Sequence, residues 1–165
     1  MPDSQTPALT PPDPGYATKV RDSFDRQAAM RLIGARLSHL EPGYADVTLP
    51  YRDDLTQQHG FVHGGITGMI ADSACGYAGY SLMPAGASVL TVEYKINMLS
   101  PAQGDTLIAR GRVIKPGKTL VITHCDVFAV HNGAEKLCAV MQQTLMVMHG
   151  RSDHKENSGQ PREAK

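Results

Sequence analysis

The chain has 165 residues, enough for one compact domain with a substantial hydrophobic core. Its 16 lysines and arginines balance its 16 aspartates and glutamates, so no net charge favours nucleic acid or an anionic membrane as a partner. None of the three cysteines forms a C-x-x-C motif, and the first residues lack the basic and apolar regions of a signal peptide. We therefore expect a cytoplasmic protein with reduced thiols.

The N-terminal end is rich in proline and polar residues, and the C-terminal end is polar and lacks aromatic residues. Such compositions cannot bury enough apolar surface to fold. This predicts a disordered N-terminal tail over residues 1–15 and a disordered C-terminal tail over residues 150–165. The remaining residues, 16–149, contain no internal repeat and no change in composition that would mark a second domain. They are expected to form a single domain.

The first predicted elements are a short helix and a strand pair. Apolar spacing favours a helix over residues 16–29. Residues 31–40 and 44–51 are predicted as two strands, because the intervening Glu41-Pro42-Gly43 is a typical turn sequence.

The only long helix is predicted over residues 64–82, and it ends at a Pro-Ala-Gly stretch. Beyond it, residues 90–98 alternate with a period of two, with Leu90, Val92, Tyr94, Ile96 and Met98 on one face. Turn residues, including the hairpin signal Asn132-Gly133, separate three further strands. These are expected at residues 105–115, 119–131 and 135–148.

This order of elements predicts an α+β fold in which a curved antiparallel sheet wraps around one long central helix. Such a sheet leaves edges, and exposed sheet edges are usually paired or covered. We expect a dimer that continues the sheet.

Small residues and one aspartate mark one face of the long helix. The steps of three and four place five residues together: Gly65, Gly68, Asp72, Gly76 and Gly79. Because glycine destabilises a helix interior by about 1 kcal/mol relative to alanine, we infer that another backbone or a ligand approaches this face. Asp72 is then a candidate site residue.

The start of the same helix, His63-Gly64-Gly65, offers unpaired backbone N–H groups and the positive end of the helix dipole. One helix is therefore predicted to supply both an oxyanion donor and a carboxylate.

The segment Gly60–Ala74, with the sequence G-F-V-H-G-G-I-T-G-M-I-A-D-S-A, resembles hotdog-fold acyl-CoA thioesterases of the PaaI-like, phenylacetate-pathway type. Later parts of the family pattern are matched by Thr91-Val92-Glu93, Ser100-Pro101 and Gly117-Lys118. The resemblance covers residues 31–148. It implies a hotdog fold and the hydrolysis of acyl-CoA thioesters to a free acid and CoA.

The resemblance also implies roles for individual residues. The Gly64 N–H would polarise the thioester carbonyl, and Asp72 would act as nucleophile or as general base for water. His63 would orient the loop or contact the thioester. Thr91 matches a position that holds the attacking water. Gln57 stands where the family usually has asparagine, so its amide is longer by one methylene.

For substrate binding, the resemblance implies aryl-acetyl or medium-chain acyl groups in an apolar tunnel, next to Gly65 at the helix start. Lys115 and Lys118, on either side of the turn at Gly117, would meet the CoA phosphates. Candidates for the tunnel lining are Phe61, Met69, Tyr77, Tyr80, Met83 and Met98. No cofactor and no metal are expected, and the family implies homodimers that assemble into homotetramers.

Two other functions fit the same fold. A hotdog hydratase or dehydratase would carry a D-x-x-x-x-H arrangement, which the helix region lacks. A non-catalytic acyl-CoA-binding or regulatory module would be expected to lack Asp72. A metal site that joins His59 and His63 to Asp72 or Cys75 is disfavoured, because the surrounding glycines argue against helical spacing there.

Overall fold

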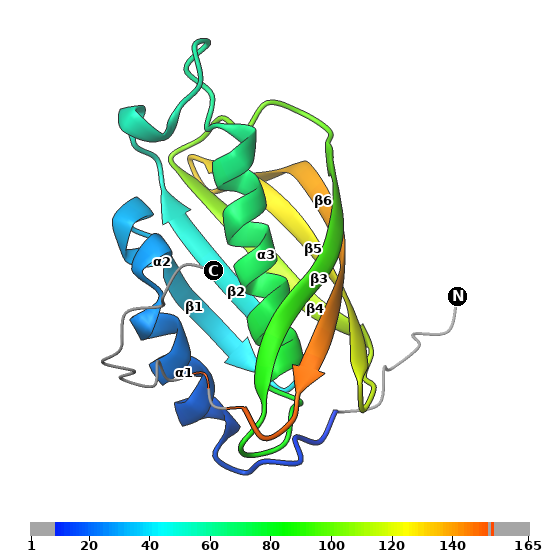
Figure 1. The fold of residues 1–165 in the computed structure, drawn as a ribbon. Coiled ribbons are helices and arrows are strands. Elements are labelled where there is room, and N and C mark those ends of the chain that lie inside the picture. The colour runs from blue at the N-terminus through cyan, green and yellow to red at the C-terminus, as the bar shows by residue number, and fades with distance from the viewer. Residues whose placement is uncertain (1–8, 152, 154–165) are drawn as a thin grey trace, which may run out of the picture.

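The computed structural model describes residues 9–151 and 153. Six antiparallel strands, in the order β1-β2-β4-β5-β6-β3, form one curved sheet around the long helix α3 (Figure 1). This is the predicted α+β architecture. The elements are α1 (Tyr16–Arg26), α2 (Ala28–Ile33), β1 (Arg36–Glu41), β2 (Tyr44–Pro50), the 3-10 turn η1 (Asp53–Leu55), α3 (Gly64–Tyr80), β3 (Ser88–Met98), β4 (Thr106–Lys115), β5 (Leu120–His131) and β6 (Ala134–Met148).

The N-terminal boundaries differ from the sequence prediction. The expected helix over 16–29 is two helices, because Gln27 is extended and ends α1. The strand expected over 31–40 is wrong in its first residues, which belong to α2. There Met30 and Ile33 are buried at the three-residue spacing of one helix face, and Gly34 ends the helix in the left-handed region with φ of 79°.

The two predicted hairpin turns are confirmed. Asn132 and Gly133 both have positive φ, 49° and 78°, as a two-residue hairpin turn requires, and they join β5 to β6. Gly43, with φ of 80°, supplies the same backbone freedom between β1 and β2. Both turns form where the residue types allow a left-handed backbone.

The helix α3 packs against the concave face of the sheet at glycines from both partners. On β4, a side chain at Gly111 would overlap with the backbone of Ala74, so this glycine sets the closest helix-to-sheet approach. Within the predicted stripe, only Gly79 is packed equally tightly, against Leu145. Gly76 has no atom within 4 Å of an added Cβ. Close packing against a side chain therefore accounts for Gly79 at one end of the stripe, whereas Gly76 in the middle has open space beside it.

A β-bulge in β3 changes which residues face the helix. Thr91 pairs with Leu145, and Tyr94 pairs with Gln143; these two residues of β6 are 0% and 1% exposed. Between the two pairs, β3 has two residues and β6 has only one. The predicted strict alternation over residues 90–98 is therefore wrong across Val92. The extra residue turns Thr91 to the helix side, together with Tyr94, since directly paired residues share a face.

All helices and strands fall inside the predicted domain, residues 16–149. Of the predicted N-terminal tail, residues 9–15 are described, and Leu9 packs against the hydrophobic core beside Gly43. Asp13 forms an ion pair with Lys19 at 3.1 Å. Residues 1–8 and 154–165 lie outside the described residues.

An aromatic cluster fixes α1 on α3. Tyr77 meets Phe24 edge-to-face, with ring centroids 5.4 Å apart, and Tyr80 lies next to Tyr77. Burial, reinforced by the charge of Asp153, raises the pKa of Tyr80 from 10.0 to about 12. Burial also raises the pKa of Tyr77. Both phenols therefore keep their protons longer in the folded chain than in the unfolded chain.

This cluster predicts a loss of stability at high pH. The stability that the neutral Tyr80 phenol contributes is fully present below pH 10.0 and is lost as the pH rises through about 12. The midpoint of urea unfolding should fall over this range, and the fall should be smaller in Tyr80→Phe, which has no phenol to ionise at this position. An equal fall in both proteins would contradict the assignment to Tyr80.

Candidate active site

The helix α3 begins at His63, which acts as its N-cap. The ring Nδ1 of His63 accepts a hydrogen bond from the Gly65 N–H at 2.9 Å, and its carbonyl accepts from Ile66 and Thr67. Within the described part of the chain, no acceptor bonds the Gly64 N–H. His63 therefore orients the loop, as the sequence allowed, and the helix presents Gly64 as its available donor.

Gln57 and Gly64 lie on one cavity of about 340 Å³. The side-chain oxygen of Gln57 accepts from the His59 N–H, so this oxygen stabilises the local turn. The amide nitrogen of Gln57 remains as a donor that can face the cavity. Apart from Gln57, Ser100 and Thr67, side chains of low polarity line the cavity: Phe61, Val62, Met98, Leu99, Pro101, Ala102 and Cys138.

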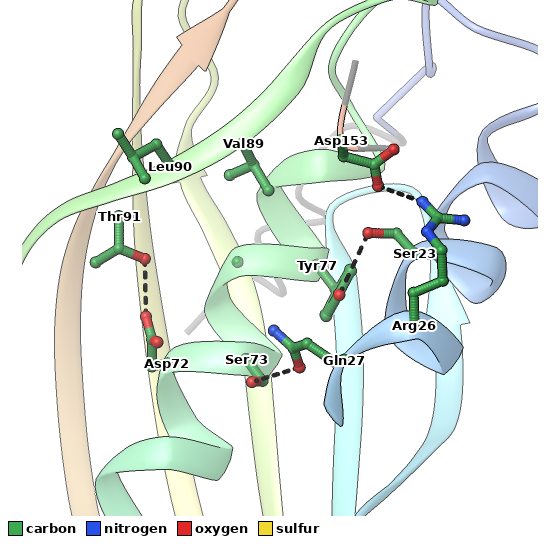
Figure 2. Close-up of a pocket in the computed structure, with 11 residues that line it drawn as sticks. Ser23, Arg26, Gln27, Asp72, Ser73, Tyr77, Val89, Leu90, Thr91 and Asp153 are labelled. Carbon is green, nitrogen blue, oxygen red and sulfur yellow. Dashed lines mark hydrogen bonds and ion pairs between the residues drawn. The ribbon is translucent and has the colours of Figure 1, made fainter. Parts of the chain in front are cut away.

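Asp72 lies in the middle of α3 and faces a second cavity of about 360 Å³. Its carboxylate Oδ1 accepts a hydrogen bond from the Thr91 hydroxyl at 2.8 Å (Figure 2). It also accepts one from the Gln143 side-chain amide. The bulge in β3 makes the first contact possible, because it directs Thr91 toward the helix. Two of the residues predicted as catalytic are thus in direct contact.

Gln143 is a site residue that the sequence analysis missed. It lies on β6, 71 residues from Asp72, and its side chain is buried. The signal available in the sequence was a glutamine at a position of the strand that faces the core, where an apolar residue is expected. Its neighbour Gln142 hides this signal, because two adjacent glutamines do not reveal which one faces inward.

The residues predicted as catalytic do not form one site within a single chain. Gly64 and Asp72 are eight residues apart on α3, which separates them by about 12 Å along the helix axis. Gln57 and Gly64 line one cavity, whereas Asp72 and Thr91 line the other. The structure therefore separates two candidate half-sites, one with the donors and one with the carboxylate.

Three of the six predicted tunnel residues line the two cavities: Phe61 and Met98 line the Gly64 cavity, and Tyr77 lines the Asp72 cavity. Met69 is partly buried against the core. Tyr80 and Met83, which are 2% and 1% exposed, belong to the core and line neither cavity.

The residues predicted to meet CoA lie at the turn between β4 and β5. Lys115 and Lys118 are exposed, and a side chain at Gly117 would overlap with the Leu120 carbonyl, which explains a glycine there. The Lys118 carbonyl accepts from His149, just after β6, and the adjacent end of β6 pairs with the start of β3. The turn therefore lies at the same end of the sheet as the Asp72 cavity.

Two further properties follow from the described residues. No group of three His, Cys, Asp or Glu side chains in this part of the chain is arranged to hold a metal ion. Nor does any helix among residues 9–151 combine the length and apolar character that crossing a membrane requires.

Comparison with known proteins identifies the family. Residues 59–136, which include the His63 cap and Asp72, match the thioesterase superfamily. A crystal structure of a thioesterase family protein from Silicibacter pomeroyi is 50% identical, with a TM-score of 0.81 over 82% of this chain and 100% of that chain. The chain belongs to the thioesterase superfamily. The predicted hotdog fold and the predicted class of enzyme, a thioester hydrolase, are thereby confirmed.

Two other proteins are similar to this chain. Human acyl-coenzyme A thioesterase 13 is 30% identical over 86 residues, which are 52% of this chain and 61% of that protein. The structure of Escherichia coli PaaI, from the phenylacetic acid degradation operon, is 24% identical, with a TM-score of 0.73 over 82% of this chain and 94% of that chain. The second likeness is one of fold.

Proposed function

We propose that this thioesterase hydrolyses acyl-CoA thioesters, with aryl-acetyl or medium-chain acyl groups as its substrates. The observation that carries the proposal is the pair of half-sites on α3, a backbone donor at Gly64 and a hydrogen-bonded carboxylate at Asp72. Thioester hydrolysis needs both groups, because charge develops on the carbonyl oxygen while water is activated. The 30% identity to a human acyl-coenzyme A thioesterase supports CoA as the thiol.

We further propose that two copies of the chain complete each site. An oxyanion donor and a base must both lie within about 3–3.5 Å of the reacting atoms, which the separation along one helix prevents. The strand β3 offers the surface for a second copy. It lies at an edge of the sheet, and Leu90, Val92 and Tyr94 are at least half exposed.

The placement of the half-sites along β3 fits such a dimer. Gly64 lies against Met98 at the end of β3, whereas Asp72 contacts Thr91 near its start. In an antiparallel pair of β3 strands related by a twofold axis, the end of one strand meets the start of the other. The pairing would therefore bring Gly64 of one copy toward Asp72 of the other.

The proposed mechanism follows from these positions. The Gly64 N–H, with the helix dipole behind it, stabilises the negative charge on the carbonyl oxygen, and Gln57 donates a second hydrogen bond. Asp72 either removes a proton from the attacking water or attacks the carbonyl itself, and Thr91 orients this carboxylate. The C–S bond then breaks, and the CoA thiolate leaves and takes up a proton. In the second case loss of CoA leaves an acyl group on Asp72 as a mixed anhydride, and water hydrolyses this anhydride to free the acid and the carboxylate. The products are the free acid and CoA.

The same positions suggest how the substrate binds. The acyl group would occupy the largely apolar cavity lined by Phe61 and Met98. The exposed Lys115 and Lys118 would meet the CoA phosphates at the turn around Gly117. We propose that the dimers assemble into homotetramers, as in the PaaI-like family, and that the enzyme acts in the cytoplasm.

The role of Asp72 can be tested by measuring thiol release. Release of free thiol from short, medium, long and aryl acyl-CoAs should be fastest for medium-chain or aryl substrates. Asp72→Asn should lower kcat by about 10³-fold or more, because the base or nucleophile is lost. Asp22→Asn, which removes an exposed carboxylate from α1, is the matched control and should leave the rate unchanged. Binding of acyl-CoA without turnover by the wild type would support a binding module instead.

The role of the Gly64 N–H can be tested by a substitution that removes only this donor. Gly64 is the first residue of α3, a position that accepts proline, and His63 before it is already extended, with ψ of 138°. Gly64→Pro therefore removes the donor with little effect on the helix, and kcat should fall by about 10²–10³-fold.

Gly64→Ala is the matched control, because it adds a Cβ and keeps the N–H. The added Cβ would lie 3.3 Å from the flexible end of Met98, which can move. This variant should retain most of the activity. Equal losses in Gly64→Pro and Gly64→Ala would argue against Gly64 as the oxyanion donor.

A further inference from the structure

Three side chains at the carboxylate half-site form a closed ring of hydrogen bonds. The Gln143 Nε2 donates to the Asp72 Oδ1 and, at 2.9 Å, to the Thr91 Oγ1. The Thr91 hydroxyl in turn donates to the same Asp72 oxygen at 2.8 Å. Gln143 is 1% exposed, so its side chain is shielded from solvent.

The chemistry of the ring fixes the orientation of the Gln143 amide. A carboxylate only accepts hydrogen bonds, so the amide nitrogen and not the amide oxygen must face Asp72. As a result, the Gln143 Oε1 is the one buried side-chain nitrogen or oxygen atom without a partner among the described residues. A buried unpaired acceptor lowers stability, and such violations are expected where function requires them.

We propose that Gln143 is a positioning residue for the Asp72 carboxylate, an inference that rests on the proposed function. Gln143 and Thr91 together place two donors on Oδ1, and no donor in the described part of the chain bonds Oδ2. The pair therefore locks the rotation of the carboxylate and presents Oδ2 to the cavity. Gln143 also accounts for the direction of the Thr91 hydroxyl, because the Thr91 oxygen accepts from Gln143 and its proton goes to Asp72.

Gln143→Met tests this role, because methionine has nearly the same length and volume but no N–H. We expect kcat on the best acyl-CoA to fall about 10- to 100-fold, with KM within about twofold of the wild type, since the carboxylate loses its orientation and substrate contacts remain. The thermal midpoint should not fall, because the unpaired Oε1 is removed as well. Gln142→Met is the matched control on the outward face of the same strand and should leave kcat unchanged.

A double variant separates positioning from a structural role. If Gln143 acts through Asp72, adding Gln143→Met to Asp72→Asn should change the residual rate by less than about twofold. A further loss of 10-fold in that background would overturn the proposal, as would an unchanged kcat in the folded single variant. Should Gln143→Met fail to fold, Gln143→Asn is the alternative. Its side chain is shorter by one methylene, so the amide nitrogen no longer reaches Asp72, and kcat should fall by the same factor.

The outcomes also distinguish this inference from the proposed function. If the wild type turns over acyl-CoA and Asp72→Asn does not, the proposed function stands whatever Gln143→Met shows. If the wild type releases no thiol from any acyl-CoA, the proposed function fails, and the role of Gln143 fails with it.

Discussion

The contact between α3 and the concave face of the sheet is the constraint on which the rest of the structure depends. Gly111 on β4 and Gly79 on α3 allow the helix to lie so close to the strands that little space remains between them. Asp72 lies farther toward the helix start, where the packing leaves a cavity, and a partly buried carboxylate there is stabilised by hydrogen-bond donors. Thr91 and Gln143 supply these donors, so the packing that stabilises the fold also determines which residues surround the carboxylate.

The fixed position of α3 on the sheet also separates the two groups proposed for catalysis. A straight helix held along the sheet keeps its N-terminus and its middle a fixed distance apart, and the two groups proposed for catalysis lie at those two places. Because the helix cannot bend to bring them together, we propose that a second α3 completes each site. The exposed edge strand β3, with apolar side chains on its surface, gives a physical reason for two copies to associate.

Most of the fold could be predicted from the sequence because its signals are local. The left-handed turn at Asn132-Gly133 and the start of α3 at Gly64 depend on neighbouring residues, and both were predicted, although the cap that His63 provides to the Gly65 N–H was not. The bulge at Val92 was missed, because the residues on either side keep an apparent period of two, and only the pairing with β6 shows the extra residue. The separation of α1 from α2 was missed for a related reason. Gln27 has no strong preference of its own, and the break depends on packing against the core.

The candidate site was predictable to the extent that one helix carries it. His63, Gly64 and Asp72 lie within ten residues, and their spacing was visible in the sequence. Gln143 was not predictable, because its contact with Asp72 joins positions far apart in the chain and depends on the register between β3 and β6. Tyr80 and Met83 lie in the core and outside both cavities, because apolar residue type does not distinguish a core position from a cavity wall.

The central claim, that two copies share each site, can be tested by mixing two inactive variants. Asp72→Asn lacks the carboxylate and Gly64→Pro lacks the donor, so a mixed dimer contains one intact site and one doubly defective site. With random association about half of the dimers are mixed, so activity should return to about a quarter of the wild-type value per chain. If mixed dimers form, as differently tagged chains would reveal, and no activity returns, each site lies within one chain and the account is wrong.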